Sequence, residues 1–187
     1  WGRPLKSIIA LFNNKIINFA FFHIQSSNLT LIDGIKEDQA RKINNFRSYL
    51  SILKSQNIIL NQEERKNIII KRMNNICNSR KLKNNFNEKL IEEVVNLVEN
   101  PNIIVGKFDE IYLKVPQEIL IVTMQQQQKY FPLFDESNKL TNIFLLVSNL
   151  PDKKRYIKIG NQRVIEARLS DAKFFWDKNK TENLVKQ

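Results

Sequence analysis

The segment from residue 160 to residue 176 constrains the fold most, because its apolar side chains recur three or four positions apart: Ile165, Leu169, Ala172 and Trp176. That spacing places them on one side of a helix, with the charged residues elsewhere. Gly160 and Asn161 stand where we expect the helix to begin, with the Asn161 side chain as its N-cap. The segment therefore predicts an amphipathic helix that closes a hydrophobic core. Its aromatic end, residues 174–176, is expected to dock on another surface.

The chain is strongly basic. Its 187 residues contain 30 Lys and Arg against 19 Asp and Glu, which gives a formal net charge of +11. Such an excess favours a polyanionic partner, because each cation set against a phosphate releases counterions. The alternative is an AT-rich genome, whose codons enrich Lys, Asn and Ile throughout a protein. The charge alone leaves both interpretations open.

Cysteine and hydropathy narrow the class of protein. Cys77 is the single cysteine, so no intrachain disulfide and no cysteine-based metal cluster can form, and a cytoplasmic location is expected. No apolar run approaches the ~20 residues of a membrane span, so we expect no membrane partner. The chain begins at Trp1 without a methionine and no signal peptide opens it. We expect it to be an internal segment of a longer protein.

The N-terminal third predicts strands. Residues 7–12 and 15–24 are rich in apolar side chains and flank Asn13-Asn14, a pair suited to a tight hairpin turn. Both faces of the second strand are mostly apolar, so we expect the sheet to be covered on both sides. His23, the single histidine, is expected to be structural and not catalytic, because no partner motif accompanies it. Asp33-Gly34 predicts a further turn.

Three helices are expected next. The first starts at Asp38 and the second at Gln62, with Ile69, Met73, Ile76 and Cys77 inward in the second. The third is capped by Asn87 and is ended by Asn100-Pro101. Beyond them we expect a strand at residues 102–108 and a helix whose first residue is Pro116. Two more strands are expected at residues 130–134 and 143–148. Tyr130 and Phe131 are expected to be buried and not to stack on bases.

Together these patterns predict one α+β domain over residues 1–187, in which a largely antiparallel sheet is packed by amphipathic helices. A helical subregion is expected at residues 38–99. We find no Gly-rich phosphate loop, no spaced metal-ligand set and no nucleophile elbow. We therefore predict no catalytic residue, no metal site and no cofactor within this chain.

Two blocks of sequence carry a family resemblance. One runs from Gly160-Asn161 through Arg163-Val164, Arg168-Leu169 and Asp171-Ala172 to Phe174-Phe175. The other joins Val115-Pro116-Gln117-Glu118 and Met124 to Gln128-Lys129-Tyr130-Phe131-Pro132, with Val147-Ser148-Asn149 after it. The chain resembles the beta subunit of bacterial, heterotetrameric glycyl-tRNA synthetase in these blocks and more loosely over nearly its whole length. Ser27 to Thr30 depart from the family's Gly-His-Arg-Phe segment, so the role of that segment is not carried over.

The resemblance implies a function. It places this chain in the N-terminal half of a subunit that engages tRNA(Gly), while the alpha subunit of an alpha2-beta2 tetramer uses ATP and Mg²⁺ to activate glycine and charges the tRNA. From the basic residues of the C-terminal part we predict a patch that positions tRNA by its phosphates: Lys129, Lys153, Lys154, Arg155, Arg163, Arg168 and Lys173. The alternatives are a purely structural scaffold, in which these charges are only solvated, and an editing-like accessory domain.

Overall fold

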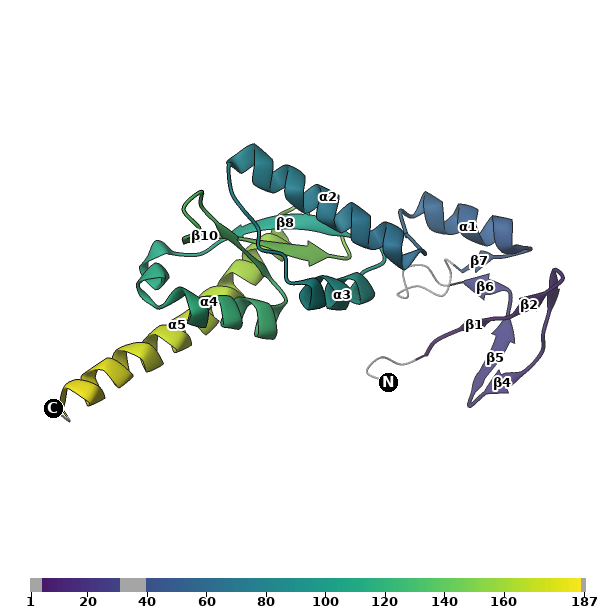
Figure 1. Cartoon of the computed structure of the whole chain (residues 1–187). Coiled ribbons are helices and arrows are strands. Elements are labelled where there is room, and N and C mark those ends of the chain that lie inside the picture. The colour runs from purple at the N-terminus through teal and green to yellow at the C-terminus, as the bar shows by residue number, and fades with distance from the viewer. Residues whose placement is uncertain (1–4, 31–39, 186–187) are drawn as a thin grey trace. The chain divides into compact units, whose positions relative to one another are not determined.

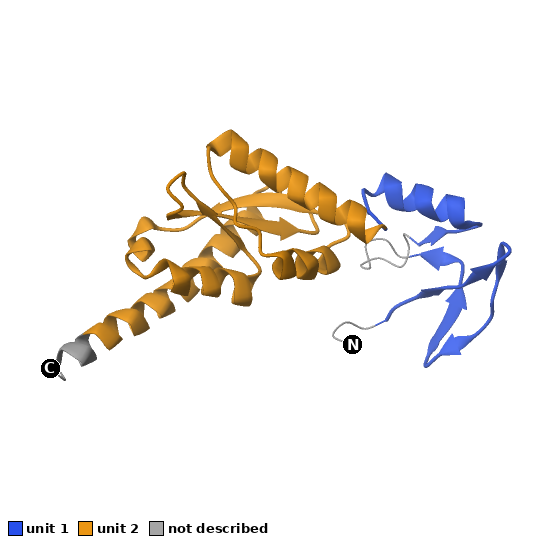
Figure 2. Cartoon of the chain, viewed as in Figure 1, with its two compact units in different colours: residues 1–60 blue, residues 61–187 orange. Residues whose placement is uncertain are grey.

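The computed structural model describes residues 5–30 and 40–185, with the side chains of 181–185 left undescribed. The predicted turn at Asp33-Gly34 and the predicted helix start at Asp38 lie outside the described residues. Two compact units divide the chain, residues 1–60 and residues 61–187 (Figure 2). Whether they fold as the single domain predicted from the sequence stays a prediction.

In its described residues, unit 1 is built from short strands and one helix (Figure 1). The strands are β1 (Ile8–Ile9), β2 (Leu11–Phe12), β3 (Lys15–Ile16), β4 (Ala20–Phe21), β5 (Ile24–Ser27), β6 (Leu29–Thr30) and β7 (Arg41–Lys42). β5 pairs with β4 antiparallel and with β1 parallel. Two antiparallel pairs, β2 with β3 and β6 with β7, complete the unit.

The predicted hairpin turn is confirmed. Asn13 and Asn14 have φ of 49° and 63° and join β2 to β3, a conformation that asparagine tolerates. The second strand, however, is divided into β3 and β4. Between them the backbone is bonded to the Ser26 side chain, whose Oγ donates to the Ile17 carbonyl and accepts from the Phe19 amide. The expectation of a sheet covered on both sides is wrong for the described residues, since Phe12 and Phe22 are 74% and 87% exposed.

Helix α1 (Phe46–Ser55) begins later than predicted. Arg41 and Lys42 form strand β7 in place of the first helical turn. Asn45 is the N-cap: its side chain accepts from the Ser48 amide, and the Ser48 hydroxyl accepts from the Asn45 amide. This reciprocal capping box fixes the start of the helix.

His23 is exposed in the turn between β4 and β5.

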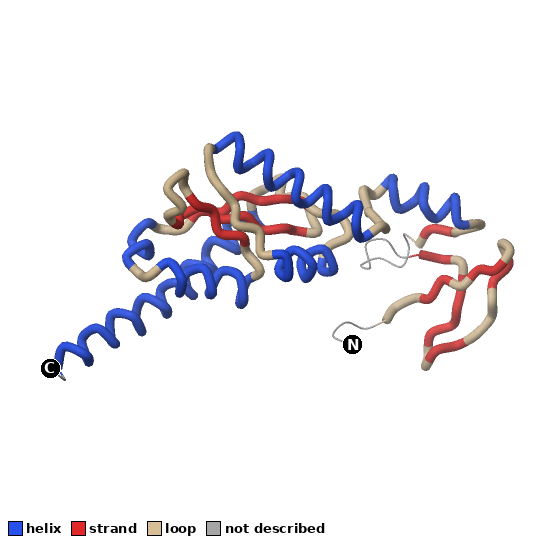
Figure 3. The backbone as a smooth tube through the Cα atoms, viewed as in Figure 1, coloured by secondary structure: helices blue, strands red, loops and turns tan. Residues whose placement is uncertain are grey.

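Unit 2 is a three-layer arrangement around the antiparallel sheet β8-β10-β9. Its strands are β8 (Asn102–Lys107), β9 (Phe131–Phe134) and β10 (Leu140–Ser148), which agree with the predicted strands apart from their ends. Figure 3 shows these strands enclosed by helices. The prediction of an α+β fold with a largely antiparallel sheet is thus confirmed.

One face of the sheet is covered by α2 (Gln62–Arg80) and α3 (Glu88–Leu97). Ile69, Met73 and Cys77 of α2 are buried there, as predicted. Asn87 caps α3 through its side chain, also as predicted, although α3 ends at Leu97, ahead of Asn100-Pro101. Lys66 and Glu88 form an ion pair between the two helices. Burial raises the pKa of the Cys77 thiol, which fits a packing residue.

The other face is covered by the 3₁₀ helix η2 (Glu110–Lys114), helix α4 (Gln117–Val122), the π-helical η3 (Thr123–Gln127) and the long helix α5 (Tyr156–Val185). Pro116 is predicted from the sequence to be the first helical residue of α4. It is instead the N-cap, and the helix begins one residue later, at Gln117. Ile165 and Leu169 of α5 are fully buried in this layer, which confirms the amphipathic stripe. Tyr130 and Phe131 are buried, as expected.

The start of α5 differs from the prediction. The helix begins at Tyr156, so Asn161 lies inside it and is not its N-cap. The free amides at its start are satisfied by Asp152, whose two carboxylate oxygens accept from the amides of Ile157 and Lys158 at 3.0 and 2.8 Å. A carboxylate at a helix N-terminus is favoured by the dipole.

The aromatic end of the predicted segment docks only in part. Trp176 packs against the core, whereas Phe174 and Phe175 are 64% and 62% exposed. They contact each other edge to face with ring centroids 5.6 Å apart. In Figure 1 the C-terminal half of α5 extends past the rest of unit 2, which explains why two of the three rings find no surface.

Candidate nucleic-acid interface

A groove with basic walls runs along the outer edge of β8 and has a volume of about 590 Å³. Among the described residues β8 pairs only with β10, so its other edge is unpaired. Residues along β8 line the groove. We call this site the basic groove. Its walls come from α2, from β8, and from the loop before α5 with the first turn of that helix: Arg72, Asn75, Ile76, Asn102, Ile103, Ile104, Val105, Pro151, Asp152, Arg155 and Lys158.

Local structure fixes the three cations of the basic groove. One guanidinium nitrogen of Arg72 donates to the carbonyl of Pro101, just ahead of β8. Arg155 has a φ of 58° and its amide donates to the Asp152 carbonyl at 3.2 Å, which forms the tight turn into α5. Lys158 lies in the first turn of that helix. Three cations from two separate parts of the unit therefore converge on one groove.

The single carboxylate in the basic groove is already engaged. Both oxygens of Asp152 accept helix amides. Because Asp152 occupies the helix N-terminus, an anion in the groove would be held by Arg72, Arg155 and Lys158 and not by backbone amides. The arrangement suits phosphate groups spaced along a chain, since the groove is open and its cations lie on different walls.

The structure brings together only part of the predicted patch. Lys153, Lys154 and Arg155 are consecutive, exposed residues, and Arg155 lines the basic groove. The Lys154 ammonium lies 6.0 Å from the centroid of the Tyr156 ring. These three residues form one cationic loop next to Arg72 and Lys158.

The other predicted cations point in different directions. Lys129 forms an ion pair with Glu93 at 2.6 Å. Arg163, Arg168 and Lys173 are five residues apart on α5, so each is rotated about 140° from the previous one around the helix. Lys173 also pairs with Asp177. The seven predicted residues therefore do not share one face, and tRNA contact by any of them stays a prediction.

Sequence reasoning misses Arg72 and Lys158. The helical period assigns Arg72 to the solvated face of α2, and Lys158 precedes the predicted helix start. A signal for Lys158 is present in Asp152, which can cap a helix that begins four residues later. Arg72 carries no such signal, because its approach to β8 depends on tertiary packing.

Residues of the two sequence blocks meet inside unit 2. The Tyr130 hydroxyl donates to Asn161 Oδ1, and the side-chain Nδ2 of Asn161 donates to the Ile157 carbonyl at 2.7 Å. Burial raises the pKa of Tyr130 to about 12. Asn149 Oδ1 accepts from the amides of Glu99 and Asn100 at 2.8 and 2.9 Å. These block residues hold the loops and helices that surround the sheet.

The described residues contain no cluster of three or more His, Cys, Asp or Glu side chains placed to hold a metal ion. Within the same residues, no helix is both long and apolar enough to cross a membrane.

Comparison with known proteins identifies relatives along the full chain. The family model described as glycyl-tRNA synthetase beta subunit matches residues 1–187. A glycine--tRNA ligase beta subunit of Dictyoglomus thermophilum is 36% identical over 187 residues, covering 100% of this chain and 27% of that protein. The one from Clostridioides difficile is 38% identical over 186 residues, covering 98% and 27%. The one from Dictyoglomus turgidum is 35% identical over 180 residues, covering 96% and 26%. The chain thus spans about a quarter of the length of these relatives.

Proposed function

Because the chain belongs to the family of glycyl-tRNA synthetase beta subunits, we propose that it engages tRNA(Gly) through phosphates and so supports the charging of that tRNA with glycine. In this proposal it acts in the cytoplasm within an alpha2-beta2 enzyme. The alpha subunit uses ATP and Mg²⁺ to activate glycine. The present segment contributes binding and positioning, and no reacting group.

The observation that supports the proposal is the basic groove with its adjoining cationic loop. Five cations belong to it, from two parts of unit 2, α2 and the loop with the first turn of α5: Arg72, Lys153, Lys154, Arg155 and Lys158. The one carboxylate among the lining residues, Asp152, is bound by two amides. Phosphate contacts of this kind give affinity and register without reading the base sequence.

Charge reversal in the basic groove tests the proposal. In the complete alpha and beta enzyme, the double variant Arg155→Glu/Lys158→Glu is expected to raise the KM for tRNA(Gly) about tenfold, because two attractive phosphate interactions become repulsive. Glycine-dependent exchange between ATP and pyrophosphate, which needs no tRNA, should stay unchanged. The slope of log affinity against log salt should become shallower by roughly one for each phosphate that the variant no longer neutralises. Glutamate is well tolerated in a first helical turn, and Arg155→Glu changes an exposed side chain while the backbone hydrogen bond of its turn remains, so the fold should persist.

The matched control is Lys114→Glu/Lys139→Glu, which changes the net charge equally at two exposed residues of unit 2 that belong neither to the basic groove nor to the predicted patch. We expect its effect on KM to be clearly smaller. An equal effect of the two double variants would mean that total charge matters and the groove does not. An unchanged KM in the groove variant, together with weaker association with the alpha subunit, would contradict the proposal and favour a scaffold. The observation that favours such a scaffold is the exposure of Phe174 and Phe175.

A further inference from the structure

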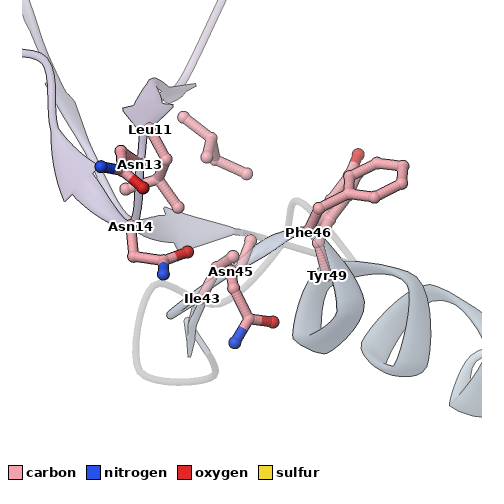
Figure 4. Close-up of a pocket in the computed structure, with 8 residues that line it drawn as sticks. Leu11, Asn13, Asn14, Ile43, Asn45, Phe46 and Tyr49 are labelled. Carbon is pink, nitrogen blue, oxygen red and sulfur yellow. The ribbon is translucent and has the colours of Figure 1, made fainter.

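A second cavity, of about 390 Å³, lies entirely within unit 1, between the turn of the β2-β3 hairpin and the start of α1. Figure 4 shows Asn13 and Asn14 on one side of the pocket and the rings of Phe46 and Tyr49 on the other. The volume falls in the range of pockets that take small organic groups, about 300–1,000 Å³. We call it the hairpin pocket.

The lining of the hairpin pocket is neutral and of three kinds. Its apolar part comes from Ile9, Leu11 and Ile43, and its aromatic part from Phe46 and Tyr49. The remaining lining residues are asparagines. An aromatic wall favours a flat ring, which can stack on it, and neutral amides favour a ring whose edge both donates and accepts hydrogen bonds. A nucleobase has both properties.

The asparagines are placed to make such hydrogen bonds. Asn13 and Asn14 are held at positive φ by the pairing of Leu11 with Ile16 and of Phe12 with Lys15. Asn45 uses its Oδ1 to accept from the Ser48 amide at 2.8 Å, which leaves its Nδ2 group to donate. An asparagine side chain offers one carbonyl acceptor and two N–H donors, the same groups that base edges present in return.

The charge around the hairpin pocket selects a polyanion. Residues 1–60 contain eight Lys and Arg against three Asp and Glu, and the three acidic residues lie outside the described residues. Arg47, exposed, follows Phe46 directly, and Phe46 itself is 68% exposed. Lys15 adjoins the asparagine turn. A neutral pocket within a unit of net positive charge fits a base whose attached backbone carries negative charge.

We propose that the hairpin pocket binds one unpaired nucleotide of an RNA, with the base stacked on Phe46 and its edge bonded to the asparagine amides. The inference rests on the proposed engagement of tRNA and adds a site in a different unit from the basic groove. Paired bases are excluded from such a pocket, because their edges and faces are already occupied in the helix.

The test measures tRNA(Gly) binding by the complete alpha and beta enzyme. Phe46→Ala is expected to weaken the affinity about five- to a hundredfold, as removal of one stacked base does. The salt dependence should stay unchanged, because the variant removes no cation. Phe46→Trp should restore binding. Phe22→Ala, which removes an exposed aromatic of the same unit outside the pocket, is the control and should bind normally.

A second variant covers the case in which Phe46→Ala disturbs the fold. Asn14→Asp keeps the shape and the positive φ but places a carboxylate in the lining, so it should weaken tRNA binding by about tenfold or more. Asn138→Asp makes the same change in a turn at φ 60° in unit 2 and should have no effect. Normal affinity in both Phe46→Ala and Asn14→Asp would overturn the inference.

Competition identifies the ligand class. A short single-stranded RNA should displace tRNA from the parent enzyme more effectively than from Phe46→Ala, and a fully paired RNA duplex should show no such difference. Displacement by AMP at low concentration, with no effect of the single strand, would instead assign the pocket to a free nucleotide and overturn the RNA proposal. If groove reversal weakens tRNA binding while the pocket variants do not, only the present inference fails. If neither set of variants has an effect, the proposed function fails as well.

Discussion

Gly106→Ala is expected to destabilise the chain by ~1–3 kcal/mol, because the added methyl group has no room. A Cβ at Gly106 would lie 2.2 Å from the Phe144 ring tip. That ring is fully buried, with Tyr130 stacked at a centroid distance of 4.8 Å and Phe108 at 6.4 Å. It cannot swing aside without displacing both neighbours. Equilibrium unfolding in urea measures the destabilisation.

Gly160→Ala supplies the matched comparison with the opposite sign. A Cβ at Gly160 meets no atom within 4 Å, and the residue lies inside α5 and not at its start. Alanine there should stabilise the chain by ~0.5–1 kcal/mol, the usual difference in helix propensity. Equal or greater stability of Gly106→Ala would contradict the packing described around Phe144.

The free energy of unfolding is expected to fall by up to about 2 kcal/mol between pH 10 and pH 12 through Tyr130 alone. Burial raises the pKa of Tyr130 in the fold to about 12, against 10 in an open chain. Below pH 10 both states keep the phenol proton, so this residue adds no pH dependence. Between the two values the unfolded chain loses the proton and the folded chain keeps it, which favours unfolding.

Tyr130→Phe should remove this part of the alkaline instability. The variant lacks the hydrogen bond to Asn161, so it should be less stable than the parent at pH 7, and the difference should shrink as the pH rises above 10. Urea unfolding at several pH values measures this. Tyr156→Phe, at an exposed tyrosine, is the control and should follow the parent at each pH. A stability difference that is constant with pH would contradict the linkage to Tyr130.

Local signals in the sequence predict those features that depend on neighbouring residues. The Asn13-Asn14 turn, the buried stripe of Ile69, Met73 and Cys77, and the Asn87 cap are all confirmed. In each case a short-range cause suffices, either a backbone preference or a helical period. The layer of α2 and α3 on one face of the unit 2 sheet follows from the last two of these features, because each helix presents an apolar face that packs on the sheet.

Features that depend on distant residues are not predicted. The sequence places the start of α5 too late, because the spacing of apolar residues shows which face of the helix is buried but not where the helix begins. The capping Asp152 is also separated from the helix by Arg155, a residue at positive φ. The surface of unit 1 is expected to be covered, because apolar residues alone do not show whether a covering element exists. For the same reason residues 174–176 are all expected to dock.

The candidate site is predicted only where sequence neighbours make it. Of the predicted cations only Arg155 lines the basic groove, with Lys153 and Lys154 directly before it in the sequence. Arg163, Arg168 and Lys173 are grouped by the prediction although the helix separates their directions. The hairpin pocket is missed altogether. A signal for it exists in the run from residue 40 to residue 60, which has no Asp or Glu and places Phe46 and Tyr49 one turn apart.

Crosslinking tests the central claim, that this basic segment contacts tRNA, most directly. A photoreactive amino acid at position 154, directly before the groove residue Arg155, should crosslink to tRNA(Gly) in the complete alpha and beta enzyme, with a yield that falls as salt rises. The same amino acid in place of Glu92 on α3, where Glu88 and Glu93 are also exposed, should yield little crosslinked RNA. Crosslinks from position 154 to protein alone, or equal RNA yields from both positions, would contradict the account.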